Sequence, residues 1–537
     1  MRFSPRPAAG QQYCSVPATP SFGGQATDEL HDLAVRRGRR GRIPADGARR
    51  AARTLGASFD HGAPAGVWVE KHLGGASDKP FQAGWTPGNV KGPSVRFLGG
   101  VREIGGNKIL IEDGPDRVLF DFGPSFGPRV EEYYVDYLQP RSTCRAKDLL
   151  EFDLVPRVPG LYSQESLGDG DLAYTPPEVH GIFVSHAHAD HAGYLDLVDP
   201  AIPVHVGEGT RTLMGAIETS TRMKYGAHAW DVFSDRKPVR VGQIEVVPYP
   251  VDHSIPFAYG FLVHTSEGTL AYTGDFRHHG PRAADTHAFF AAVAAEKVDA
   301  LLIEGTRAGP DPRRNLSEAG VRSAVDRVLQ TSPGLALACT YPRDIDRLRT
   351  LYAAAVETDR ELVVSTRTAH LLSQVAHRFP PGEIPVPGQA NGLRVHVRKK
   401  RVSYLWERPF LDDALPSEEL RHRGRKYLLA LDLAHFPELI DLRPPTGSPF
   451  IHSMSEPFSE DDVDDRVMHN WLDHFGLQFH QMHASGHASA SELLDLIRLT
   501  GARTVYPIHT EHPEAFEKVG PSVRLPDLGA TYPLVGE

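Results

Sequence analysis

The stretch Gly-Ile-Phe-Val-Ser-His-Ala-His-Ala-Asp-His, residues 181–191, decides the fold of this chain. Its first five residues predict a short buried strand. The next six hold three histidines and an aspartate. His186 and His188 stand at alternate positions and can face one metal ion, while Asp190 and His191 can turn toward a second. Four candidate ligands within six residues predict a dinuclear metal site at the strand end, in preference to a histidine-rich surface loop.

Two later segments add candidate ligands at the ends of predicted strands. The strand at 243–249 is followed by Asp252-His253-Ser254, and the strand at 270–273 is followed by Gly274-Asp275. Glycine permits a sharp bend at position 274, so Asp275 is well placed to bridge two ions. We therefore expect His253 and Asp275 to join the same metal site.

This order of motifs, H-x-H-x-D-H, then D-H-S, then T-G-D, resembles the metallo-β-lactamase superfamily. The resemblance implies an αββα sandwich that binds two Zn²⁺ ions, with Mn²⁺ as an alternative metal. It implies the following ligand set: His186, His188 and His253 on one zinc, Asp190, His191 and His509 on the other, and Asp275 as the bridge. Asp121, at the end of a predicted strand at 118–123, resembles the aspartate that orients a ligand imidazole in this fold.

Three further segments resemble the motifs of β-CASP nucleases, and in particular the ribonuclease J branch. Glu304 ends the predicted strand 300–306, the sequence His-Ala-Ser-Gly-His occupies 483–487, and His509 ends the predicted strand 504–509. The resemblance implies that His487 is a general acid paired with Glu304, and that these two act with Asp190 and Asp275 in catalysis. It also places His483 at the substrate phosphate, and we expect Ser485 and Ser455, in the segment 453–457, to contact the phosphate as well. The alternative for Glu304 is a strand-end carboxylate that caps a loop.

The region between these motifs predicts a second α/β domain. A strand at 335–339, a helix at 344–356 and a strand at 361–365 follow one another, which favours parallel pairing. The fold prediction is therefore α/β: a metallo-β-lactamase αββα sandwich (93–308 and 481–537) with an inserted β-CASP parallel α/β domain (309–480). Two basic clusters in the insertion, 398–401 beside Tyr404 and Trp406, and 421–426, suit single-stranded nucleic acid. A solvated basic face is the alternative.

Composition sets limits on the class of protein. The 537 residues include 40% hydrophobic and 23% charged side chains, as in soluble globular proteins, and no apolar run is long enough to span a membrane. Three dispersed cysteines exclude a disulfide framework and favour a cytoplasmic location. The net charge of −10 argues mildly against a protein that wraps nucleic acid with its whole surface. Residues 1–92, rich in Arg, Gly, Ala and Pro, predict a disordered tail.

These features together predict a zinc-dependent ribonuclease that hydrolyses phosphodiester bonds of single-stranded RNA, as an exonuclease, an endonuclease or both. A β-CASP nuclease acting on DNA and an inactive RNA-binding subunit are the alternatives. His509 favours RNA, because the resemblance associates a histidine there with RNA-cutting members. Thr510-Glu511 departs from the usual Gly-Glu at this point. The chain ends at Glu537, so we expect the carboxy-terminal domain of bacterial ribonuclease J to be absent, which leaves a homodimer open. The segment 133–177 has no assigned role.

Overall fold

The computed structural model describes residues 92–126, 130, 132–135, 137–310, 316–457, 462–520 and 522–535. All of them belong to one compact unit, Lys79–Glu537. The tail expected at 1–92 lies outside the described residues except for Gly92. Among the described residues, no helix is both long enough and apolar enough to cross a membrane.

The first sheet has seven strands in the order β19-β1-β2-β3-β4-β5-β6. Their bounds are β1 Ser94–Gly99, β2 Lys108–Asp113, β3 Asp116–Phe120, β4 Gly181–Val184, β5 Val204–Gly207, β6 Trp230–Phe233 and β19 Thr531–Pro533. β1, β2 and β3 pair antiparallel, as their short connections predict, and the pairs from β3 to β6 are parallel.

The second sheet has six strands in the order β18-β11-β10-β9-β8-β7. Their bounds are β7 Val239–Val241, β8 Ile244–Val251, β9 Ala258–His264, β10 Thr269–Tyr272, β11 Ala300–Glu304 and β18 Thr504–Ile508. β18 pairs in parallel with β11, with Glu304 opposite Ile508. This register carries Glu304 and the residue after β18, His509, to the same edge of the sheet.

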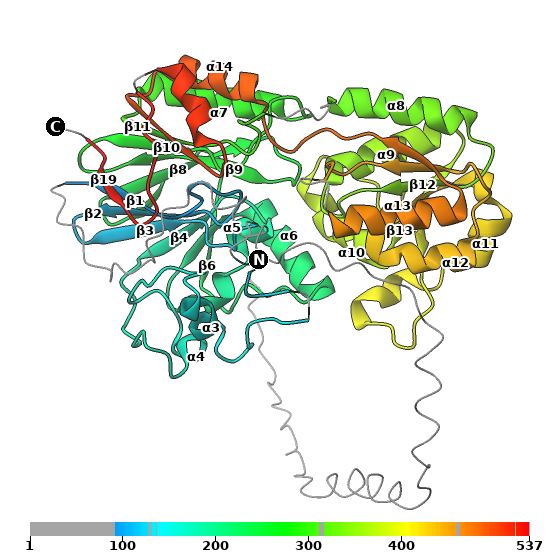
Figure 1. Ribbon diagram of the computed structural model, residues 1–537, viewed down its shortest axis with the longest axis horizontal. Coiled ribbons are helices and arrows are strands. Elements are labelled where there is room, and N and C mark those ends of the chain that lie inside the picture. Colours follow the sequence, from blue (N-terminus) through cyan, green and yellow to red (C-terminus); the bar gives the residue numbers. More distant parts are fainter. Residues whose placement is uncertain are drawn as a thin grey trace, which may run out of the picture. The chain divides into compact units, whose positions relative to one another are not determined.

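The two sheets face each other and share an apolar core. In β2, Ile109 and Ile111 point into this core while Leu110 points outward, because successive strand residues face opposite sides. Aromatic rings from both sheets meet there, and the tilted rings of Phe120 of β3 and Phe261 of β9 lie 5.3 Å apart. Helices cover the outer faces: α3 Arg145–Glu151, α4 Gln164–Leu167 and α6 Glu208–Ser220 on one side, α7 Ala283–Glu296 and α14 Ala490–Thr500 on the other. This is the predicted αββα sandwich (Figure 1).

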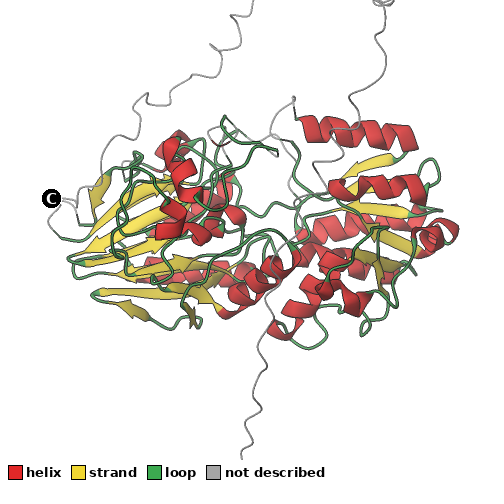
Figure 2. Ribbon diagram, turned by 90° about the horizontal axis from the view of Figure 1, so that it is seen from below, coloured by secondary structure: helices red, strands yellow, loops and turns green. Residues whose placement is uncertain are grey.

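The third sheet confirms the predicted parallel α/β insertion. Its order is β14-β13-β15-β12-β16-β17, and every pair is parallel. The strands are β12 Ala336–Cys339, β13 Glu361–Ser365, β14 Leu393–His396, β15 Tyr427–Ala430, β16 Pro449–His452 and β17 Gln478–Gln481. The helices are α8 Glu318–Thr331, α9 Ile345–Glu357, α10 Thr366–Val375, α11 Ser417–His422, α12 Leu439–Leu442 and α13 Val463–Phe475. Helices lie on either side of these strands (Figure 2). The domain boundaries 309 and 480 stay predictions.

Candidate metal centre

All seven side chains predicted as metal ligands meet at one edge of the sandwich. They come from the loops after β4, β8, β10 and β18, and from the short helix α5, Ala189–Ala192. They form two groups that share Asp275: His186, His188, His253 and Asp275, and Asp190, His191, Asp275 and His509. In each group the ligand atoms lie within 4.8 Å of one another. The metal-binding role of each residue remains a prediction.

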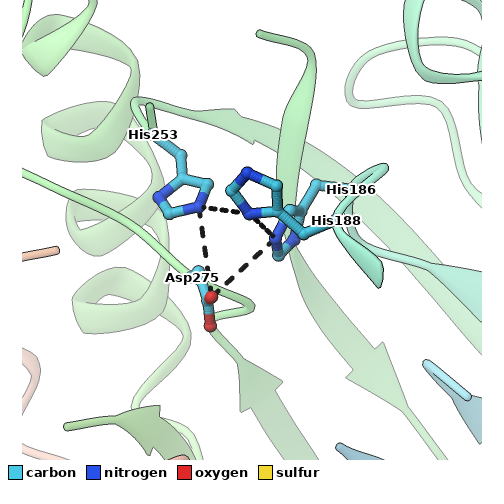
Figure 3. Close-up of side chains that lie close together, drawn as sticks. All are labelled: His186, His188, His253 and Asp275. Atoms are coloured by element: carbon cyan, nitrogen blue, oxygen red, sulfur yellow. Dashed lines mark hydrogen bonds and ion pairs between the residues drawn. The ribbon is translucent and has the colours of Figure 1, made fainter. Parts of the chain in front are cut away.

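The first group turns three imidazole nitrogens toward one point (Figure 3). His188 Nδ1 lies 3.0 Å from His186 Nε2 and 3.1 Å from His253 Nε2. Asp275 Oδ2 lies 3.8 Å from His186 Nε2 and 4.0 Å from His253 Nε2. Burial lowers the pKa of His186 and His253 well below the usual value, and that of His188 to about 4. These rings are therefore neutral at neutral pH and carry the lone pairs that a metal needs.

The second group combines two imidazoles with two carboxylates. His191 Nε2 lies 3.2 Å from Asp275 Oδ2, and His509 Nε2 lies 3.1 Å from Asp190 Oδ2. Burial alone would raise the pKa of Asp190, but His191 and His509 hold it well below the usual value. Asp190 is therefore ionised and can act as an anionic ligand.

Four of the five ligand imidazoles are oriented through their other ring nitrogen. His191 Nδ1 lies 2.7 Å from Asp121 Oδ2, His253 Nδ1 donates to the Gly486 carbonyl at 2.6 Å, and His509 Nδ1 lies 2.8 Å from Thr306 Oγ1. Ser185 Oγ lies 3.0 Å from His186 Nδ1. Such partners fix the tautomer and leave the inner nitrogen free for a metal. Asp121 lies where its predicted orienting role requires, whereas no pattern in the sequence pointed to Thr306 or to the Gly486 carbonyl.

Two buried polar atoms test whether a metal fits this cluster. His191 Nε2 and Asp275 Oδ1 are buried and have no hydrogen-bond partner among the described residues. Both belong to the ligand groups, and an unsatisfied buried polar atom is costly. The donor set is rich in imidazole and carboxylate, which suits zinc. The site therefore fits a metal cofactor.

Glu304 and His487 form a pair beside the ligand groups. His487 Nδ1 lies 3.1 Å from Glu304 Oε1, and the other carboxylate oxygen accepts a hydrogen bond from the Thr306 backbone N–H at 2.9 Å. Glu304 is fully buried, while the side chain of His487 is 20% exposed. His487 also lines a cavity of about 670 Å³ together with His188, Asp190, Asp275 and His509. Glu304 therefore holds His487 by one nitrogen and leaves the other facing the cavity.

The three residues predicted at the phosphate also line this cavity. Ser485 Oγ accepts a hydrogen bond from the His487 N–H at 3.1 Å, and Ser455 Oγ lies 2.9 Å from the Tyr341 hydroxyl. His483 Nδ1 donates to the Ser453 carbonyl at 3.3 Å, and burial together with Arg347 lowers its pKa to about 3. Neutral His483 in this tautomer presents an acceptor at Nε2. A contact of His483 with the substrate phosphate stays a prediction, and this tautomer does not favour a hydrogen bond donated from Nε2 to the phosphate.

The two basic clusters lie at opposite ends of the parallel strands of the third sheet. Residues 421–426 immediately precede β15, whereas the cavity residue Tyr341 follows the carboxyl end of β12, which pairs in parallel with β15. That cluster therefore lies at the edge remote from the cavity, which favours the alternative of a solvated face. Residues 398–401 follow the carboxyl end of β14. Lys400 there pairs with Glu407 and lies 5.1 Å from the Tyr404 ring, which stacks on Trp406.

Comparison with known proteins places this geometry in a family. Residues 156–339 match the family described as a β-lactamase superfamily domain. Residues 475–518, which carry the His-Ala-Ser-Gly-His segment and His509, match a Zn-dependent metallo-hydrolase RNA specificity domain. The chain is therefore similar to β-CASP proteins of the ribonuclease J type. The family resemblance and the fold class predicted from the sequence are thereby confirmed.

Curated relatives of this chain are named ribonuclease J. That of Helicobacter pylori strain J99 is 22% identical over 77% of this chain and 55% of the relative. That of Thermus thermophilus is 26% identical over 82% of this chain and 74% of the relative. That of Synechocystis is 24% identical over 77% of this chain and 60% of the relative. The chain thus spans little more than half the length of the Helicobacter relative.

A solved structure shares the whole fold. The crystal structure of a protein of unknown function from Enterococcus faecalis superposes with a TM-score of 0.67 at 24% identity, covering 82% of this chain and 99% of the other. At this identity the likeness concerns the fold alone.

Proposed function

We propose that this chain is a metal-dependent ribonuclease that hydrolyses phosphodiester bonds of single-stranded RNA. One observation carries the proposal: two ligand groups that share Asp275 open onto the same cavity as the Glu304–His487 pair. Paired metal sites are typical of enzymes that displace groups at phosphorus. The RNA specificity family matched at 475–518 supports RNA over DNA as substrate.

We propose two Zn²⁺ ions as the cofactor, with Mn²⁺ as the alternative. His186, His188 and His253 would hold one ion, Asp190, His191 and His509 the other, and Asp275 would bridge them. When bound, the ions would supply an activated water and neutralise negative charge on the phosphate. Imidazole-rich donor sets favour zinc over manganese.

The protein's own groups would then handle the leaving group. Glu304 holds Nδ1 of His487, so the opposite nitrogen faces the cavity and can carry a proton to the departing 3′-oxygen. Ser485 accepts from the backbone of His487 and so fixes the loop that presents this ring. The product would be a 5′-phosphate. A cytoplasmic location stays a prediction that rests on the dispersed cysteines, and a homodimer stays a prediction without structural support.

The test uses a 5′-monophosphorylated single-stranded RNA and its DNA counterpart, with zinc or manganese added and products resolved by length. The wild type is compared with an Asp190→Ala, His191→Ala double variant, which removes two ligands of one ion. We expect RNA cleavage by the wild type alone, and the ladder separates exonucleolytic from endonucleolytic cutting. If the wild type cleaves the DNA strand in preference to the RNA strand, DNA would replace RNA as the proposed substrate. Binding without cleavage of either strand would indicate an inactive RNA-binding subunit.

A further inference from the structure

Four titratable side chains gather outside the metal centre, on the helical face of the sandwich. His278 and His279 come after Asp275 in the segment that follows β10, His287 lies in α7, and Glu492 lies in the first turn of α14. The two helices pack side by side over the second sheet (Figure 1). None of the four side chains belongs to the two ligand groups of the metal centre. The proposed cleavage reaction therefore leaves these imidazoles without a role.

The imidazoles of His278 and His287 converge on one point. His278 Nε2 lies 2.7 Å from His287 Nε2 and 3.4 Å from His287 Nδ1, and the ring centroids are 4.1 Å apart. In the metal centre, the separation between His186 Nε2 and His188 Nδ1 is 3.0 Å. Two nitrogens that bind a tetrahedral zinc ion at about 2.0–2.1 Å lie about 3.3 Å from each other. The nitrogen separations of the His278–His287 pair therefore bracket the separation that one zinc ion requires.

The surroundings of His278 favour the form of its ring that binds a metal. Burial lowers the pKa of His278, and repulsion from His287 adds to this shift, so the ring is neutral at neutral pH. Its Nδ1 lies 3.7 Å from Glu492 Oε1. Burial alone would raise the pKa of Glu492, but hydrogen bonds from His279 and Ser489 lower it to about 2. An ionised carboxylate near Nδ1 favours the proton on that nitrogen and leaves Nε2 with its lone pair.

The pair is also open to solvent. The side chain of His278 is 27% exposed, and His287 is exposed on the surface of α7. An ion can therefore reach the two nitrogens and complete its coordination with water. Two imidazoles suit a transition metal such as Zn²⁺, Ni²⁺ or Cu²⁺, whereas Mg²⁺ and Ca²⁺ take oxygen ligands.

We propose that His278 and His287 form a further metal site, which binds one transition-metal ion outside the catalytic cavity. Neither residue lines that cavity, so the site goes beyond the proposed function. The bound ion would join the segment after β10 to helix α7. With two protein ligands in place of the four in each group of the metal centre, this site should fill only after the centre is loaded. A hydrogen bond between two neutral rings is the alternative, and it requires no ion.

The experiment is equilibrium dialysis of the zinc-loaded protein against a series of free zinc concentrations, with the bound zinc counted per chain. We expect the wild type to bind one ion more than His278→Gln and His287→Gln, while all three proteins keep the zinc of the metal centre. His422→Gln is the matched control and should bind as many ions as the wild type. His422 is an exposed helix histidine that also lies 3.7 Å from a carboxylate, that of Glu418.

Thermal unfolding supplies a readout that does not count ions. A ligand that binds only the folded chain raises Tm as its concentration increases, and each further bound ion steepens this rise. The Tm of the wild type and of His422→Gln should therefore rise more steeply with zinc concentration than the Tm of His287→Gln. Equal slopes in all three proteins would contradict the site.

The same number of bound zinc ions in the wild type and in both glutamine variants of the pair would overturn the inference and leave the two rings joined by a hydrogen bond. Loss of the additional ion from His422→Gln as well would also overturn it. Because His287 is exposed, His287→Gln decides the matter even if His278→Gln fails to fold. RNA cleavage does not enter either measurement, so the site and the proposed ribonuclease can fail separately.

Discussion

His487 and Glu304 are the side chains whose roles can be separated from metal binding. Neither belongs to a ligand group. We expect His487→Ala to lower kcat about 10²- to 10⁴-fold, the usual contribution of general acid catalysis, while the zinc content per chain stays unchanged. Glu304→Gln should lower kcat less, because it keeps the shape of the residue that holds His487 Nδ1.

Single-turnover rates on RNA and metal analysis of the same samples check this expectation. Because the two side chains act as a unit, the double variant should be no slower than His487→Ala alone. Loss of zinc from His487→Ala would show that His487 is a ligand and would contradict the assignment.

Asp121 offers a test of the partners that orient the ligands. It is fully buried, its φ is 57°, and its carboxylate binds His191 and the Ser185 and Tyr272 hydroxyls. Asp121→Asn should weaken zinc affinity about 10- to 100-fold, because the amide no longer fixes the His191 tautomer. Chelator competition measures the affinity. Tyr272→Phe is the control, since it removes one hydrogen-bond donor to Asp121 and leaves the contact between Asp121 and His191. An equal loss of zinc affinity in both variants would assign the effect to general destabilisation.

The N-terminal cap of helix α14 lies next to the loop that carries His487. Its amino terminus carries a capping box formed by Ser489 and Glu492. Ser489→Ala should lower the free energy of unfolding by about 1 kcal/mol and also lower kcat, because His487 stands two residues before the cap. Asp462→Ala removes the side-chain cap of α13 and should cost a similar amount of stability without changing kcat. Urea unfolding measures the stability of both variants, and cleavage kinetics measure their kcat. An equal kcat in both variants would show that the cap of α14 does not position the loop that carries His487.

Strands and helices with strong local patterns were the predictable elements. β3, β4, β8, β10, β11 and α9 follow from apolar runs or helical spacing, and the order of the ligand motifs predicted a metal centre at the ends of β4, β8 and β10. β14 to β17 had no such signal, because they are four-residue strands whose pairing depends on the sheet around them. The residues that orient the ligand imidazoles could not be predicted from the sequence either. Thr306 and His509 are 203 residues apart, and His253 and Gly486 are 233 apart, so only the fold brings them together.

A buried ionic network joins the sandwich to the inserted domain. The guanidinium of Arg277 is fully buried and lies 2.9 Å from both Asp252, after β8, and Asp346 of α9, and 3.2 Å from Glu318 of α8. Arg277→Met would leave these carboxylates buried without their counterion. We expect a loss of about 3–5 kcal/mol of stability, the usual cost of breaking a buried ion pair from one side.

Chemical denaturation checks this value, with Arg322→Met as control, since Arg322 forms a partly exposed pair with Asp326 within α8. A cost below about 1 kcal/mol for Arg277→Met, the range of surface pairs, would show that solvent screens the network.

The same network makes stability depend on pH through Asp344, the N-cap of α9. Burial raises its pKa from 3.8 to about 6, although Arg347 opposes the shift. The folded protein therefore holds this proton more tightly than the unfolded chain does. Between pH 3.8 and about 6 the unfolded chain has already lost it, so the contribution of Asp344 to stability falls as the pH rises and stays low above pH 6.

Asp344→Asn cannot ionise, and its amide oxygen can still cap α9 by accepting from the Arg347 N–H, as Asp344 does at 2.9 Å. Relative to the wild type, this variant should therefore gain on the order of 2 kcal/mol of stability between pH 4 and pH 7. Asp432→Asn is the control of opposite sign. Burial alone would raise the pKa of Asp432, but the hydrogen bond to His435 lowers it, so loss of this carboxylate should cost more as the pH rises. Unfolding curves at a fixed zinc concentration measure both differences. A difference for Asp344→Asn that is flat with pH would mean that Arg347 and Arg277 keep Asp344 ionised throughout.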